Sequence, residues 1–344
     1  MTSENKNCFE SDKQYNRFIY NFDFDSLKKL EILNEKKNFY ELLLLYFTTY
    51  ILVAVGIYLT SISFFCYFIT IFFIAGRQGA FLQLIHDASH NLISKNGKKN
   101  DFFGEYLVGY PIGVNFLGFR SGHNNHHSNT ATVNDSPSDL DKYLDVNYKK
   151  FNLYYSFLKD LLGVSAIKVF FSYNSTNKAL DNFFISKKKI LSLVKIASVQ
   201  LFILFLFRFN ILNYFLFWVY PLVGPHMFLM RIRGMAEHGQ SNQLGCVSEN
   251  NSAGTFYTRS FLTHVDTYSS KLLYLLEKVL IGSYNVNYHH EHHLFPKVPW
   301  YNLPSLSQKI SDKIKKLDNS KVYNKGYLAA AFNQQEIRRE GSLS

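Results

Sequence analysis

Long apolar runs and long polar runs alternate along the chain. The first apolar run, residues 42–76, contains 35 residues without a single charged side chain. One membrane-spanning helix takes about 20 apolar residues, so this run predicts a hairpin of two spanning helices. We place the helices at 42–60 and 62–82, with the turn near Thr60 to Ser63. The alternative for such a run is a buried helical hairpin of a soluble protein.

The second apolar region, residues 190–230, is interrupted only by Lys195 and Arg208. It predicts two further spans at 190–208 and 211–230, with the turn at Arg208 to Asn210. The fold class predicted from these runs is an all-α integral membrane protein with four transmembrane helices.

Polar segments precede and separate these spans. Residues 1–41 are charged, and Ser26 could cap a short helix there that is either interfacial or simply solvated. Residues 91–189 are polar except for 106–119, whose Gly and Pro content is poor for a spanning helix. We interpret 106–119 as a re-entrant or interfacial segment, and 136–141 (SPSDLD) as a turn.

The region after the last span has two helical signals. Residues 272–281 are apolar but too short to span a membrane, which predicts a helix that lies on the membrane or packs under the histidine clusters described below. Apolar residues at Leu306, Ile310 and Ile314 repeat with helical spacing. The predicted organisation is an N-terminal segment (1–41), a membrane domain (42–304) and a C-terminal tail (305–344).

The charge balance points to an anionic surface. The formal net charge is +11, and the basic residues are mostly Lys in the polar segments. The sequence has no nucleic-acid-binding motif, so we expect a membrane surface, and in addition an acidic partner protein. The two predicted turns within the apolar regions carry only Arg208. The positive-inside rule then predicts that both termini lie in the cytosol.

The cysteines and the first residues narrow the choice of chemistry. Cys8, Cys66 and Cys246 are isolated from one another, which indicates neither a cysteine metal site nor a disulfide framework. The polar first 17 residues predict no cleavable signal peptide, so insertion would depend on the internal spans.

Most of the histidines occur in three clusters. These are HDASH at 86–90, HNNHH at 123–127 and HHEHH at 289–293. A spacing of four places two imidazoles on one helix face, one turn apart, and imidazole is the commonest protein metal ligand. Ordinary core or surface histidines usually come singly, so the clusters predict metal binding on the cytosolic side. The candidate ligands are His86, His90, His123, His126, His127, His289, His292 and His293.

Four further histidines have different predicted roles. His238, in AEHG just beyond the fourth predicted span, is a ninth candidate ligand because it would face the same site as the first cluster. His226 lies inside a predicted span and is expected to be packed or to face substrate. His264 is expected to be structural, and His290 to point away from the site.

The ligand type restricts the metal. Neutral nitrogen ligands suit iron, zinc, copper or nickel rather than calcium or magnesium. Zinc takes only three or four ligands per ion, so eight or nine histidines indicate two ions. Two irons at the mouth of a helical bundle could activate O2 against an apolar chain. Asp87 and Glu237 adjoin candidate ligands and could orient them as hydrogen-bond acceptors, although ordinary solvation is the alternative for each.

These motifs resemble the membrane fatty acid desaturases and their hydroxylase relatives. The family's HxxxH, HxxHH and HxxHH boxes are matched in order by HDASH, HNNHH and HHEHH, and RQGAFLQLIHDASH, AEHG and NYHHEHHLFP are similar as well. The resemblance covers roughly residues 40–300. It implies four spans, a cytosolic helical cap and a histidine-ligated di-iron centre. The implied ligands are His86, His90, His123, His126, His127, His238, His289, His292 and His293.

The resemblance also implies the reaction. O2 and two electrons would remove two hydrogens from an acyl chain and leave a cis double bond and water. The HPGG motif of relatives fused to cytochrome b5 is absent, so a separate ferredoxin or cytochrome b5 is expected as donor, docked on the Lys-rich face. Gly234 stands where acyl-CoA desaturases carry an Asn, which makes the site more similar to that of the alkane hydroxylases. The flanks of the second box are most similar to bacterial acyl-lipid-type desaturases.

Two alternatives remain at this point. A hydroxylase or ketolase of the same superfamily, acting on an alkyl, sphingolipid or carotenoid chain, would use the same boxes and differ only in where the substrate lies. A zinc membrane hydrolase or a metal carrier is the non-redox alternative. A carrier should place its ligands inside the spans, whereas only His226 lies there.

Overall fold

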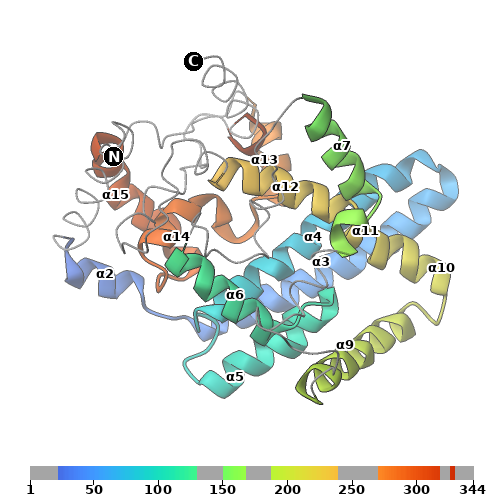
Figure 1. The fold of residues 1–344 in the computed structure, drawn as a ribbon, viewed down its shortest axis with the longest axis horizontal. Coiled ribbons are helices and arrows are strands. Elements are labelled where there is room, and N and C mark those ends of the chain that lie inside the picture. The colour runs from blue at the N-terminus through green and yellow to red at the C-terminus, as the bar shows by residue number, and fades with distance from the viewer. Residues whose placement is uncertain (1–21, 130–149, 168–186, 239–269, 318–325, 330–344) are drawn as a thin grey trace. The chain divides into compact units, whose positions relative to one another are not determined.

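The computed structural model of the chain describes residues 22–129, 150–167, 187–238, 270–317 and 326–329. Within these ranges every regular element is a helix (Figure 1). The chain forms two compact units. The first unit comprises residues 1–32, 123–152 and 230–344, and the second unit comprises 33–122 and 153–229.

The second unit contains a long apolar hairpin. It is formed by α3 (Glu35–Ile62) and α4 (Phe65–Ser89), which pack against each other (Figure 1). The side chain of Asn34 accepts a hydrogen bond from the Lys37 backbone N–H and so caps α3. At the crossing of the two helices, a Cβ added to Gly56 would lie 2.2 Å from Cγ2 of Thr70. The sequence predicted the hairpin at this place, and both helices are longer than predicted.

Short helical pieces follow the hairpin. They are α5 (Gly97–Phe102), the π-helix η1 (Phe103–Gly109), the 3₁₀-helix η2 (Tyr110–Ile112) and α6 (Phe116–Asn129). The pieces η1 and η2 pack on α4, and η2 also packs on α9 (Lys187–Leu206). The helix η2 ends at Gly113, whose φ of +69° suits glycine. The segment 106–119, interpreted from the sequence as re-entrant or interfacial, is therefore a broken helix, and its pieces η1 and η2 pack against long helices.

The second apolar region forms a turn where the sequence predicts one. Arg208 and Phe209 have φ values of +52° and +56°, so the chain reverses there after α9. The return path is α10 (Ile211–Tyr214), the π-helix η4 (Phe215–Val219), α11 (Tyr220–Val223) and α12 (Pro225–His238). The short helix α7 (Lys150–Leu161) precedes α9 in the chain.

Three helical stretches are long and apolar enough to cross a membrane. They are Glu35–Ile62, Phe65–Ser89 and Ile211–Glu237. The third of the four predicted spans is a shorter apolar helix, Ile190–Leu206. Three of the four predicted spans thus coincide with candidate membrane helices in the described part of the chain.

The first unit is built on shorter helices around a small apolar core. Its elements are α2 (Phe24–Leu30), α13 (Lys271–Leu280), η6 (Ser283–Tyr288), α14 (His289–Leu294), η7 (Trp300–Asn302) and α15 (Leu303–Leu317). Leu306 and Ile310 of α15 are fully buried in a core with Leu27, Leu294 and Phe295. The predicted helical spacing of the tail is confirmed by this burial.

One predicted helix start is wrong. The N-cap of α2 is Asp23 rather than Ser26, and its carboxylate accepts hydrogen bonds from the N–H groups of Asp25 and Ser26. Ser26 lies inside the first turn and donates its hydroxyl proton to Asp23. The hydrogen bonds with Ser26 hold the pKa of the Asp23 carboxyl below its usual value. A capping residue must precede the first turn to reach its free N–H groups, which explains why the cap is Asp23 and not Ser26.

The predicted turn at 136–141 and His264 lie outside the described residues.

Candidate metal centre

The second and third histidine clusters meet inside the first unit. The second cluster lies on the last two turns of α6, and the third cluster forms most of α14 (Figure 1). Nε2 of His292 lies 3.1 Å from Nε2 of His127. Nε2 of His127 lies 3.0 Å from that of His123, and Nε2 of His289 lies 3.0 Å from that of His293. Two clusters separated by more than 160 residues therefore turn the same ring nitrogen toward each other.

The six histidines form two adjacent groups. Potential ligand atoms of His126, His289 and His293 lie within 4.8 Å of one another, and so do those of His123, His127 and His292. The rings of His127 and His293 stack with centroids 4.3 Å apart, which joins the groups. His290 is also buried but belongs to neither group.

The nitrogen separations fit metal ligation. Two nitrogens about 2.1 Å from one ion and at right angles to each other are about 3.0 Å apart. The Nε2 separations are 3.0 to 3.1 Å. His126, His289, His292 and His293 are buried. The neutral imidazole ring is the form that binds a metal. The residues of both groups are therefore able to bind metal.

Backbone geometry and apolar contacts fix α14 in place. Tyr284 and Asn285, just before it, adopt left-handed backbone angles with φ of +52° and +56°. Such angles are uncommon outside glycine and cluster at functional sites. The Asn285 side-chain amide donates to the Trp300 carbonyl at 3.1 Å. At the end of the helix, Leu294 and Phe295 enter the apolar core, so both ends of the histidine segment are anchored.

Glu237 lies beside the third cluster. It is the penultimate residue of α12, and its Oε2 is 3.7 Å from Nε2 of His289. Nε of Arg233 donates to both carboxylate oxygens at 3.0 Å. The carboxylate thus faces the ring nitrogen that is turned toward the other histidines. His238, the last residue of α12, follows it directly, and its side chain is outside the described residues.

The first cluster lies in the second unit at the end of α4. The rings of His86 and His90 have centroids 5.3 Å apart, as expected one turn apart. Nδ1 of His86 lies 3.3 Å from Oδ1 of Asp87. A proton on Nδ1 would satisfy that carboxylate and leave Nε2 available for a metal. Burial, followed by the charge of Arg120, lowers the pKa of His90 to about 4, which keeps the ring neutral.

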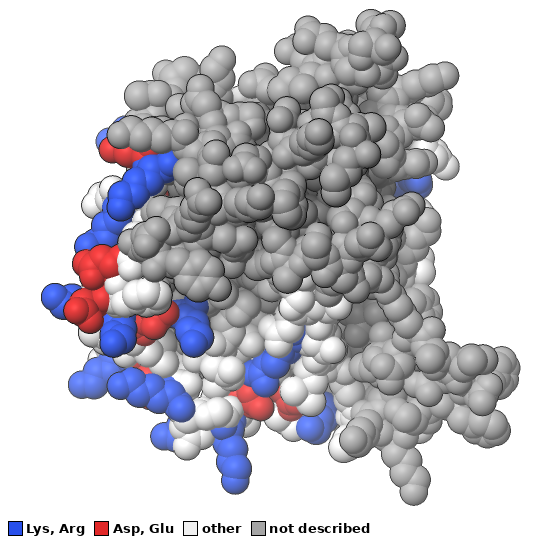
Figure 2. All heavy atoms as spheres, turned by 60° about the vertical axis from the view of Figure 1, so that its left-hand side comes forward, with Lys and Arg blue, Asp and Glu red and all other residues white. Residues whose placement is uncertain are grey.

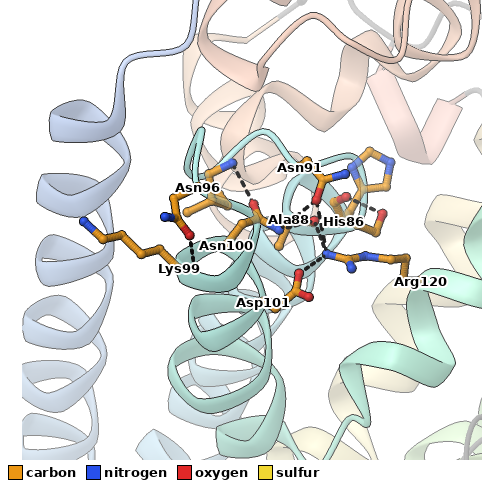
Figure 3. Close-up of polar contacts among 10 residues, drawn as sticks. His86, Ala88, Asn91, Asn96, Lys99, Asn100, Asp101 and Arg120 are labelled. Atoms are coloured by element: carbon orange, nitrogen blue, oxygen red, sulfur yellow. Dashed lines mark hydrogen bonds and ion pairs between the residues drawn. The ribbon is translucent and has the colours of Figure 1, made fainter.

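A polar network fixes the end of α4 (Figure 3). The Arg120 guanidinium donates to Asp101 at 2.6 Å and to the Ala88 carbonyl at 3.2 Å. The side-chain amide of Asn100 donates to the same carbonyl at 2.9 Å. Helix-terminal carbonyls lack partners within the helix, so these donors hold the turn that carries the first cluster. Sequence reasoning missed Arg120 and Asn100, because no local pattern links them to Ala88.

The second unit also has an apolar groove of about 230 Å³. It is bordered by α3, α9 and the segment from Arg208 to Trp218. Tyr46 at the groove packs edge-on against Phe81 of α4, with ring centroids 5.1 Å apart. His226, predicted to be packed or to face substrate, is buried on α12. The groove offers a hydrocarbon chain an apolar surface among the long helices.

Comparisons with a family model and with individual known proteins all match desaturases. The sequence model of the fatty acid desaturase family matches residues 62–323. The sphingolipid delta(4)-desaturase DES1 of Rattus norvegicus is 27% identical over 245 residues, which is 70% of this chain and 63% of that protein. A sphingolipid delta(4)-desaturase of Candida albicans is 27% identical over 249 residues, covering 70% of this chain and 61% of that protein. The matched region is thus about three fifths of the length of these relatives.

Proposed function

The chain belongs to the fatty acid desaturase family, and from this premise we propose that it is a membrane-bound, O2-dependent desaturase of a lipid hydrocarbon chain. The observation that carries the proposal is the convergence of six imidazoles from α6 and α14, of which three pairs have Nε2 separations of 3.0 to 3.1 Å. An iron centre held by them would supply the oxidising power for C–H cleavage. Overall, O2, two electrons and two protons would be consumed as two hydrogens leave the chain, giving a double bond and two waters.

Two irons are the proposed metal content. The six histidines of the first unit would provide most of the ligands, and His86, His90 and His238 would complete the set. All of these side chains are neutral donors, which suits iron and excludes the hard cations. Asp87 beside His86 would favour the tautomer that leaves Nε2 for the metal.

The apolar helices would bind and shield the substrate. A hydrocarbon chain held along apolar side chains loses contact with water, and a dry site limits side reactions. The groove bordered by α3, α9 and Trp218 is a surface of this kind. The chain's own residues would therefore position the carbons to be oxidised and exclude water from them.

The substrate class has two candidates. Similarity around the second histidine box favours an acyl chain of a membrane lipid. The names of the two relatives, both sphingolipid delta(4)-desaturases, favour a sphingolipid chain. A hydroxylase or ketolase outcome would need only a different position of the carbon over the site.

The proposed topology places four spans in the membrane and both termini and all histidine clusters in the cytosol. Exposed lysines gather at the start of the hairpin and on α5, namely Lys36, Lys37, Lys95, Lys98 and Lys99. Lys and Arg side chains, interspersed with Asp and Glu, are also conspicuous on the face in Figure 2. We propose that this basic surface docks an acidic ferredoxin or cytochrome b5. Turnover with the purified donor should then fall as salt rises, and a salt-insensitive rate would contradict donor docking.

Lipid analysis of expressing cells tests the function. Cells making the full chain should contain lipids two mass units lighter than their precursors, with the new double bond located by fragmentation. Cells making His289→Ala at equal abundance are the control and should lack these lipids. Hydroxylated or keto products would favour the alternative activity. Two tightly bound zinc ions without oxygen consumption would favour the non-redox alternatives.

A further inference from the structure

Tyr327 connects the C-terminal tail to the candidate metal centre. Its hydroxyl donates to Oε1 of Glu237 at 3.1 Å, although the two residues are 90 positions apart. The Tyr327 side chain is only 1% exposed. The residue lies beyond the region matched by the family, which ends at residue 323. No pattern in the sequence around Tyr327 predicts a role for it.

The tail is held in place by a second buried glutamate. Glu277 of α13 accepts hydrogen bonds from the backbone N–H of Tyr327 at 2.8 Å and of Leu328 at 3.2 Å. A buried carboxylate is costly unless it is hydrogen-bonded, and these two donors supply such bonds. Gly282, just after α13, lies beside the tyrosine ring, since an added Cβ would be in ordinary van der Waals contact with its Cε2 at 3.5 Å. Tyr327 thus occupies a defined position.

The hydroxyl fixes the orientation of Glu237. It holds Oε1, while Arg233 contacts both oxygens. Oε2 is then directed toward Nε2 of His289 at 3.7 Å, and that nitrogen lies 3.0 Å from Nε2 of His293. A continuous path of contacts runs from the tail through one carboxylate to the third histidine cluster.

We propose that Tyr327 is a positioning residue for the metal centre, which it serves by holding the Glu237 carboxylate against the histidine cluster. The inference rests on the proposed function. Imidazoles bring no charge, whereas bound ions are strongly positive and dominate the local electrostatics. A fixed carboxylate offsets that charge in a buried site. Partners that orient a metal site typically change metal affinity by about 10- to 100-fold when removed.

Cobalt binding to the purified, metal-stripped full chain tests the proposal. Co²⁺ is titrated into wild type and Tyr327→Phe, and affinity and the visible absorption spectrum are recorded. Tyr327→Phe removes one oxygen and keeps the ring, so the metal-free protein should still fold and should melt only slightly below wild type, because one buried hydrogen bond is lost. We expect affinity to fall by about tenfold or more and the spectrum to shift. Tyr301→Phe is the matched control, because that hydroxyl contacts the Ile32 carbonyl at 3.4 Å and not Glu237.

A double-mutant cycle shows whether Tyr327 acts through Glu237. In the Glu237→Gln background, Tyr327→Phe should have little further effect on cobalt affinity. Full additivity of the two losses, or an unchanged affinity and spectrum in Tyr327→Phe, overturns the positioning role and leaves the metal centre intact. Failure of wild type to bind cobalt overturns the proposed metal centre, and this inference with it.

Discussion

The two units differ in which side chains they expose and which they bury. Among the described residues, most exposed large apolar side chains belong to the second unit, such as Phe47, Phe65 and Ile211. The first unit instead buries histidines and glutamates around a small apolar core. Exposed apolar side chains suit lipid as solvent, whereas buried imidazoles need partners. The contrast indicates that the second unit is adapted to the membrane and the first unit to holding ions.

Replacing a histidine of the first unit should give the largest effect. In His289→Ala, one of the three closely spaced nitrogens of its group is lost, so turnover should fall at least about 100-fold. Membrane insertion should remain intact, because no span changes. Product formation per inserted protein is the measurement, with His290→Ala as control, since that neighbouring buried histidine belongs to neither group. Equal activity of wild type and His289→Ala would show that His289 is not needed for the reaction.

A charge introduced on the exposed face of α3 tests whether the second unit is adapted to the membrane. Ile51 is exposed near the middle of this helix. If that face contacts lipid, Ile51→Arg should disfavour insertion by about 2.5–3.5 kcal/mol. Ile32→Arg is the matched control, because Ile32 is also exposed but lies in the first unit. Glycosylation reporters quantify insertion, and equal tolerance of both changes would argue against α3 as a span.

The close packing of the hairpin predicts a smaller effect. In Gly56→Ala the new methyl would come 2.2 Å from Cγ2 of Thr70, so the Thr70 side chain must rotate or α3 and α4 must move apart. Overpacking of this kind costs about 1–3 kcal/mol. Gly97→Ala should be neutral or stabilising, because nothing lies within 4 Å of its added Cβ. The melting temperatures of Gly56→Ala and Gly97→Ala in detergent are the measurement. Equal melting temperatures would show that α3 and α4 are not closely packed at Gly56.

Removing the charge of Arg120, which contacts the end of α4 beside the first histidine cluster, should have the smallest effect on stability. Arg120→Gln loses the contacts to Asp101 and the Ala88 carbonyl. Since this ion pair is partly exposed, the expected cost is about 1.5 kcal/mol. Arg208→Gln, at the turn after α9, is a control that leaves the network intact. A melting temperature of Arg120→Gln as high as that of the control would show that the network contributes nothing.

Sequence reasoning succeeded where a repeating local pattern exists. The uncharged run of residues 42–76 predicted a hairpin, and α3 and α4 form one. The turn at Arg208 to Asn210 was predicted from the break between two apolar runs, and it lies between α9 and α10. The four-residue histidine spacing placed two imidazoles on one helix face, as the close nitrogens of His289 and His293 confirm.

The rest could not be predicted because it depends on contacts between distant residues. Nothing near Tyr327 in the sequence indicates Glu237 as its partner, and the approach exists only once the tail packs on α13. Arg120 likewise meets the end of α4 through tertiary packing. The predicted cap of α2 was wrong by a few residues, because Asp23 and Ser26 are both good capping residues.

Iron content tests the central claim most directly. The full chain, expressed in iron-supplied cells and purified without chelators, is analysed by elemental analysis alongside variants of each histidine group. We expect about two iron atoms per wild-type chain, since two adjacent histidine groups are present. His293→Ala and His127→Ala should each lower the content, with membrane insertion unchanged. A chain that holds no iron, or keeps the same iron in both variants, would contradict the claim.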